Sequence, residues 1–213
     1  MNFCDQFYAR LLALSERPAQ LFPRDIFPDN YRTAAVLLAF WPEPDGSVGL
    51  VLTRRSDHLR HHQGQVSFPG GSMQAEDVSA VQTALREAEE ELALSAQHVT
   101  IMGRLDDAWS RFGYHVVPVV GWLQQRPQLI PDPDEVAEVI IADVATLMRP
   151  EASCMHQLAD RHSQAYRWEQ GYVWGLTAEI LLELFLWVRG EDSNRRDFRL
   201  AYMRKQLGEG DIT

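Results

Sequence analysis

Four glutamates close a predicted helix that follows a Pro-Gly-Gly turn. Glu87, Glu90 and Glu91 lie three or four residues from one another, so a helix can bring their carboxylates onto one patch. Like charges at this spacing destabilise a helix by roughly a few tenths of a kcal/mol per pair. Oxygen ligands of this kind suit Mg²⁺ or Mn²⁺, which would convert the repulsion into coordination. The pattern predicts a metal site, although a solvated acidic helix face has the same sequence appearance.

The helix that carries these acids is predicted to run from about Asp77 to Leu92. Val81, Leu85, Ala88 and Leu92 recur at spacings of four, three and four, which is typical of one buried apolar stripe. The glutamates are expected to lie away from the centre of this stripe. Arg86 lies four residues before Glu90, where it can pair with that carboxylate and orient it, or form a plain surface salt bridge.

The segment before the helix, residues 56–76, has little periodicity and is predicted to be a long loop. Gly70 and Gly71 would let its backbone approach a ligand closely, although Pro-Gly-Gly also forms ordinary turns. The loop and the end of the preceding strand hold a dense basic cluster of Arg54, Arg55, Arg60, His61 and His62. Set in a chain of net charge −10, this cluster predicts phosphate binding by Arg55, Arg60 and His62, against the alternative of a solvated basic loop.

Composition narrows the class of protein. The chain has 213 residues, 46% of them hydrophobic, and a sequence pI near 5.1, so it is expected to form one domain without nucleic-acid binding. Residues 1–30 are expected to be an N-terminal helical and extended segment, and residues 189–213 a charged tail. These two segments could form the interface of a homodimer, and the sequence does not decide between a monomer and a homodimer. The two cysteines, Cys4 and Cys154, form no readable disulfide or zinc pattern, and no apolar run could span a bilayer. We therefore expect a cytoplasmic protein with a small-molecule partner and no membrane association.

Strands and helices alternate irregularly along the chain. The sequence predicts an N-terminal helix at 3–14, a pair of strands at 33–40 and 48–55 joined by a tight connection, and two later strands at 98–105 and 114–123. It also predicts a strand leading into a short helix at 135–148, a hairpin at 165–175 and a buried closing helix at 176–188. We expect an α/β (α+β) fold with a mixed sheet packed between helices. The tryptophans, including Trp109, Trp168 and Trp174, are interpreted as core or hairpin packing rather than as platforms on which an adenine ring stacks. Glu135 follows a Pro-rich loop and is a candidate general base, or else a solvated residue at a strand edge.

Residues 71–94 resemble the Nudix box, a loop-helix motif whose Arg-Glu-x-x-Glu-Glu core stands here as Arg86 to Glu91. The stretch departs from the box in four respects. Asp77 replaces a glutamate, the spacer after it is one residue longer, Ala88 is small for an aliphatic position, and Ala93 stands where a glycine belongs. The resemblance implies a Nudix-type α/β/α sandwich, a hydrolase of nucleoside diphosphate derivatives, and Mg²⁺ or Mn²⁺ held by Glu87, Glu90 and Glu91, with Arg86 supporting them.

The stretch 52–71, which reads LTRRSDHLRHHQGQVSFPGG, is similar to the signature that precedes the box in the coenzyme A pyrophosphatase branch of this family. That resemblance implies cleavage of coenzyme A or its derivatives to 3′,5′-ADP and 4′-phosphopantetheine, or its acylated form. The sequence does not distinguish free, oxidised and acylated coenzyme A. Another nucleoside diphosphate substrate such as ADP-ribose is the alternative within the family, and the stretch 52–71 favours coenzyme A over it. A catalytically silent binding module is the alternative outside enzymes, and it would be expected to have lost box carboxylates that are retained here.

Overall fold

The computed structural model describes residues 2–19, 21, 27, 29–56, 64–110, 112–158 and 162–191. Its α-helices are α1 (Phe3–Leu12), α2 (Ala80–Leu92), α3 (Val144–Leu147) and α4 (Leu176–Arg189). Its strands are β1 (Arg32–Pro42), β2 (Val48–Arg55), β3 (Val66–Ser67), β4 (Gly70–Ser72), β5 (Thr100–Arg104), β6 (Ala108–Ser110), β7 (Tyr114–Trp122), β8 (Val136–Asp143), β9 (Ser153–Gln157), β10 (His162–Trp168) and β11 (Gly171–Trp174). In these residues, no helix is long and apolar enough to cross a membrane.

The main sheet is mixed. Strands β1 and β7 pair in parallel from Arg32 to Phe40 of β1, along all of β7. The other pairings in this sheet are antiparallel. The strand order is β3-β2-β1-β7-β5, with β4 paired to β1, β6 to β7 and β8 to β2. β1 is buried along most of its length because both of its faces are covered, as its continuous apolar run predicted. The predicted connection between β1 and β2 is confirmed as an antiparallel hairpin.

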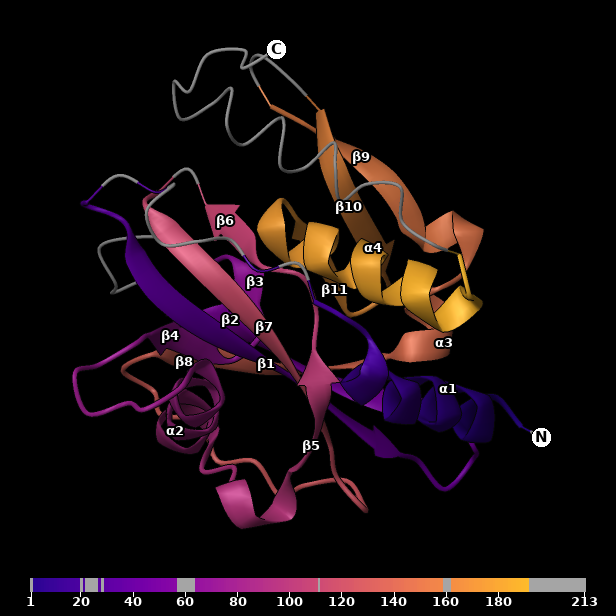
Figure 1. Ribbon diagram of the computed structural model, residues 1–213. Helices are drawn as coiled ribbons and strands as arrows, with labels where there is room; N and C mark the ends of the chain where they lie inside the picture. The colour runs from indigo at the N-terminus through magenta and orange to yellow at the C-terminus, as the bar shows by residue number, and fades with distance from the viewer. Residues whose placement is uncertain are drawn as a thin grey trace.

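Helices cover both faces of the main sheet (Figure 1). Helix α2 packs on one face, where Ala84, Ala88 and Leu92 meet Ala35 and Leu37. Helices α1 and α4 lie on the other face, in a second core that includes apolar residues of the β9–β11 sheet. Alternate residues of β1 point into the two cores, which is the pattern of a strand buried on both faces. The expected mixed sheet between helices is therefore confirmed.

Two predictions about the segment around the acidic helix are wrong. Residues 56–76 are not all loop, because the described part contains β3 and β4, and β4 pairs antiparallel with β1. Helix α2 begins at Ala80 rather than near Asp77, because Ser79 is its N-cap and accepts a hydrogen bond from the Gln82 N–H at 3.2 Å. Strands β6 and β9 have no counterpart among the predicted elements. Both are short, and each pairs antiparallel with the next strand along the chain, β7 and β10 respectively.

Candidate functional site

The glycine turn and helix α2 meet because β4 holds the turn against β1. Gly70 and Gly71 pair with Val36 and Ala35. Gly70 has φ +151°, and a Cβ there would overlap the backbone of Val36, so only glycine fits. A Cβ on Gly71 would overlap the Glu87 carboxylate. The two glycines thus let the carboxylates of α2 lie directly against the backbone of the turn.

Glu91 is the buried member of the acidic group. Only 4% of its side chain is exposed, and its Oε2 accepts a hydrogen bond from the Gly70 N–H at 3.3 Å. Arg55 Nη1 lies 4.0 Å from its Oε1. Burial raises the pKa of Glu91 to about 8, the nearby charge of Arg55 opposes this rise, and the charge of Glu87 adds to it. Glu91 is therefore a buried carboxylate with little compensation.

The other two carboxylates of the predicted metal site point to different surroundings. About 12% of the Glu87 side chain is exposed, against 51% for Glu90. Burial raises the pKa of Glu87, while Arg86 acts in the opposite direction. Glu90 extends toward Arg86 and pairs with it at 2.7 Å. In the part of the chain that the structure describes, no three acidic, His or Cys side chains are arranged as a metal site.

The predicted inward face of α2 needs correction. Thr83, Ala84 and Glu91 are buried together with Ala88 and Leu92, whereas Val81 and Leu85 are only partly buried. The helix is therefore turned so that Glu91 lies between the helix and β4 instead of away from the core.

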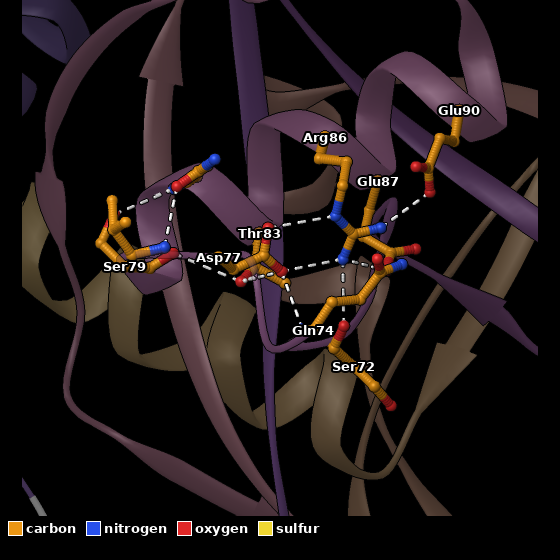
Figure 2. A network of polar contacts seen from close by, with 10 residues as sticks. Ser72, Gln74, Asp77, Ser79, Thr83, Arg86, Glu87 and Glu90 are labelled. Carbon is orange, nitrogen blue, oxygen red and sulfur yellow. Dashed lines mark hydrogen bonds and ion pairs between the residues drawn. The ribbon is translucent and has the colours of Figure 1, made fainter.

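Arg86 holds the carboxylates in place through an extended network (Figure 2). It donates to Asp77 through Nε at 3.2 Å and Nη2 at 3.0 Å, and to the Ser72 carbonyl at 3.1 Å. It also pairs with Glu87 at 2.8 Å and with Glu90 at 2.7 Å. The predicted Arg86–Glu90 pair is present, but it is one contact of several. These partners raise the pKa of Arg86, so the guanidinium stays charged.

Asp77 was predicted as the start of the helix and as the residue that replaces a glutamate of the motif, and the structure makes it the buried anchor of this network. Its Oδ2 accepts hydrogen bonds from the Gln74 N–H at 2.9 Å and the Thr83 hydroxyl at 3.0 Å. The hydrogen bonds from Arg86 are the main reason that the pKa of Asp77 falls to about 2. The matching acid in the family motif was the one sequence signal for this role, but a helix-starting residue gives the same signal.

Glu135 acts on the same carboxylates through its charge, which contributes to the raised pKa values of Glu87 and Glu91. Its carbonyl accepts a hydrogen bond from the Ser56 N–H at 2.9 Å, which ties the loop before β8 to the end of β2. Arg55 leaves β2 at a bulge against β8, and bulges re-aim side chains in this way. The structure therefore brings Arg55 and Glu135 to the helix, which their sequence positions alone did not show.

Of the other residues in the basic cluster, the structure describes only Arg54. Arg54 pairs with Glu138 at 2.8 Å on the surface, away from the acidic helix. Arg60 and His62, together with His61, lie outside the described residues. The predicted phosphate role of Arg60 and His62 therefore stays a prediction.

The chain is similar in sequence and in fold to known proteins. The sequence model of the NUDIX domain matches residues 30–168. The chain is 40% identical over 162 residues to the protein named "Uncharacterized Nudix hydrolase NudL" of Yersinia pestis (strain Pestoides F), and the match covers 74% of this chain and 80% of the relative. The protein of the same name in Yersinia pseudotuberculosis (serotype O:1b, strain IP 31758) gives the same values. A crystal structure of a MutT/nudix family protein from Enterococcus faecalis superposes with a TM-score of 0.52 at 16% identity, over 90% of this chain and 85% of that one. At this low identity, the likeness to the Enterococcus faecalis structure shows a shared fold and nothing more.

Proposed function

The chain belongs to the Nudix family of hydrolases, which act on pyrophosphate bonds, and we propose that its substrate is coenzyme A or a derivative. The products would be 3′,5′-ADP and 4′-phosphopantetheine, or acyl-phosphopantetheine from an acylated substrate. The support for this substrate begins with the stretch 52–71, whose residues resemble those of coenzyme A pyrophosphatases.

The observation that carries the proposal is the approach of Arg55 to Glu91. One residue comes from the 52–71 signature and the other from the acidic helix, and they lie 4.0 Å apart. The buried Arg55 Nε has no hydrogen-bond partner in the described structure. The guanidinium therefore keeps donor capacity beside the carboxylates, and Arg pairs well with phosphate oxygens. The two sequence signals thus converge on one site that can receive a pyrophosphate.

Glu87 and Glu91 fit a hard divalent cation. Burial raises the pKa of both carboxylates, and the nearby arginines, Arg86 at Glu87 and Arg55 at Glu91, only partly oppose the rise. Mg²⁺ keeps several waters and shares substrate phosphates, so two protein carboxylates are a sufficient anchor. We assign Glu87 and Glu91 as the main ligands, with Glu90 joining them if it turns away from Arg86. A bound Mg²⁺ or Mn²⁺ would offset the negative charge of the pyrophosphate and make water more acidic.

The remaining site residues are proposed to position the carboxylates, accept a proton from water or contact the substrate. Arg86 is a positioning residue, since it holds Glu87 and Glu90 through ion pairs. Glu135 is proposed as the general base: water oxygen bonds to phosphorus, the bridging P–O bond breaks, and the proton of the water passes to the Glu135 carboxylate. Gly70 and Gly71 bring the backbone of the turn near the substrate. Arg60 and His62 are proposed to contact its phosphates.

Product analysis of the wild-type protein tests the substrate. Free, oxidised and acylated coenzyme A and ADP-ribose would each be incubated with Mg²⁺ or Mn²⁺, and the products separated by chromatography. We expect 3′,5′-ADP from the coenzyme A compounds, at rates well above the cleavage of ADP-ribose. Cleavage of ADP-ribose alone would refute the coenzyme A assignment and leave the Nudix chemistry in place.

A further inference from the structure

The small sheet β9–β11 has two unlike faces. Tyr166, Trp168 and Val173 are buried in the core beneath α4. The alternate positions of the same strands point the other way, because side chains along a strand alternate between its faces. Four of them, which we call the aromatic face, are partly or fully exposed: His156, Arg167, Tyr172 and Trp174. Trp174 is thus not part of the core, in contrast to Trp168.

The aromatic face is an ordered cluster. The His156 ring stacks on Trp174 with centroids 4.3 Å apart and an interplanar angle of 20°. Its Nδ1 is 2.8 Å from the Tyr172 hydroxyl. Arg167 places its guanidinium 4.6 Å from the centre of the Tyr172 ring, at the end of the cluster. Among the described residues, no carboxylate lies within ion-pair distance of Arg167. The cluster therefore presents fixed rings next to a cation that is available to an anion.

The edge of the small sheet lies near the strand that leads into the glycine turn. β11, which carries Tyr172 and Trp174, is an edge strand of the small sheet. It lies beside β3 (Figure 1). Three residues after Ser67, at the end of β3, the chain reaches Gly70, whose N–H binds Glu91. An extended ligand with one end at the acidic helix could therefore reach the small sheet by passing along β3.

We propose that the aromatic face binds the adenosine 3′-phosphate end of the substrate. The purine ring stacks on the His156–Trp174 pair, and the 3′-phosphate pairs with Arg167. Purines stack on aromatic side chains, and a guanidinium pairs with phosphate in a charge-assisted contact. This inference rests on the proposed function, because coenzyme A carries a planar base and a 3′-phosphate on the same ribose.

Two substitutions separate the base contact from the phosphate contact. Trp174→Leu should raise the KM for coenzyme A about tenfold with little change in kcat, whereas Trp174→Phe, which keeps a ring, should stay near the wild type. Arg167→Gln should raise the KM for coenzyme A but not for 3′-dephospho-coenzyme A. Arg126→Gln is the matched control, since Arg126 is an exposed arginine that lies close to Glu43 rather than on the small sheet.

Calorimetric binding of 3′,5′-ADP in the presence of a chelator gives a readout that needs no catalysis. We expect wild-type binding that weakens about tenfold in Trp174→Leu. If that variant does not fold, as judged by circular dichroism, His156→Leu removes the other ring of the same stack. Absence of wild-type binding, or equal binding by the folded variants, would overturn the inference. Failure of the wild type to cleave coenzyme A would instead refute the proposed function, and the 3′,5′-ADP titration would still decide the role of the aromatic face.

Discussion

Glu91, near the end of helix α2, accepts a hydrogen bond from the Gly70 N–H at 3.3 Å, and this contact fixes the helix against the glycine turn. The carboxylate is almost fully buried. Burial of this charge lowers stability, because a buried charge without full compensation is costly. A cation received at the site would supply the missing compensation. Glycine is needed at the turn for a separate reason, because Gly70 has φ +151° and a Cβ at Gly71 would overlap the Glu87 carboxylate.

The buried charge of Glu91 should lower stability when no metal is present. Its pKa is about 8 in the folded protein against an ordinary value of 4.5, so the folded state binds more protons than the unfolded state between these values. Stability in EDTA should therefore fall as the pH rises from about 4.5 to about 8. Glu91→Gln should melt at a higher temperature than the wild type at pH 8.5, with the difference shrinking toward pH 4.5. Glu89→Gln, at an exposed position of the same helix, should show no such difference; equal melting curves for the wild type and Glu91→Gln would contradict this account.

Gly71→Ala should impair activity more than folding. The added Cβ would overlap the Glu87 carboxylate, a flexible group that can move aside. A carboxylate displaced in this way should lower kcat/KM about 10- to 100-fold. Ser72→Ala is the control, because it changes the next residue of β4 and leaves the carbonyl that accepts from Arg86 in place. Steady-state rates and circular dichroism test this prediction, which fails if both variants retain wild-type activity.

Asp77→Asn should destabilise the fold by about 1.5–3 kcal/mol, the range for hydrogen bonds to charged groups. The pKa of Asp77 is lowered to about 2 from its ordinary 3.8. Its contribution is thus complete above about pH 4 and is lost as the pH falls through about 2. Urea unfolding at pH 7 and at pH 2.5 would measure both effects. The exposed neighbour Glu76 supplies the control Glu76→Gln, and a loss of stability equal to that of the control would argue against an anchoring role for Asp77.

Ala93→Gly should stabilise the protein. Ala93 ends helix α2 with φ +53° and ψ +28°, and it is the one non-glycine residue with positive φ among those the structure describes. Glycine adopts this conformation without the steric cost that alanine carries, so a gain of about 0.5–1 kcal/mol is expected in denaturant unfolding. Ala96→Gly tests specificity, because Ala96 lies in a short helix with negative φ and should lose stability. A destabilised Ala93→Gly would mean that this left-handed cap is not strained.

Local pattern was enough to predict most of the architecture. The apolar runs of β1 and α4 predicted a mixed sheet between helices, which the structure confirms. The glutamate spacing of α2 predicted the acidic side chains of the candidate site, and their role stays a prediction. The orientation of α2 could not be predicted from its own residues. Val81 and Leu85 fit an apolar stripe as well as Thr83 and Ala84 do, and the choice depends on how β4 packs against the helix.

The contacts that complete the site depend on pairing between distant strands. The pairing of Gly71 with Ala35 places the turn under Glu87, and the bulge between β2 and β8 turns Arg55 toward Glu91. Neither relationship has a local sequence pattern. The network of Asp77 was hidden for a different reason, since an aspartate just before a helix is an ordinary capping residue.

The most direct test of the central claim compares the release of 3′,5′-ADP from coenzyme A by the wild type, Glu91→Gln and Glu89→Gln in Mg²⁺ or Mn²⁺. Glu91 and Glu89 lie on the same helix and the substitutions remove the same charge, but only Glu91 faces the glycine turn. The account predicts metal-dependent cleavage by the wild type and Glu89→Gln, and a loss of about 100-fold or more in Glu91→Gln. A folded Glu91→Gln that cleaves coenzyme A at the wild-type rate would contradict the assignment of this buried carboxylate to the metal site.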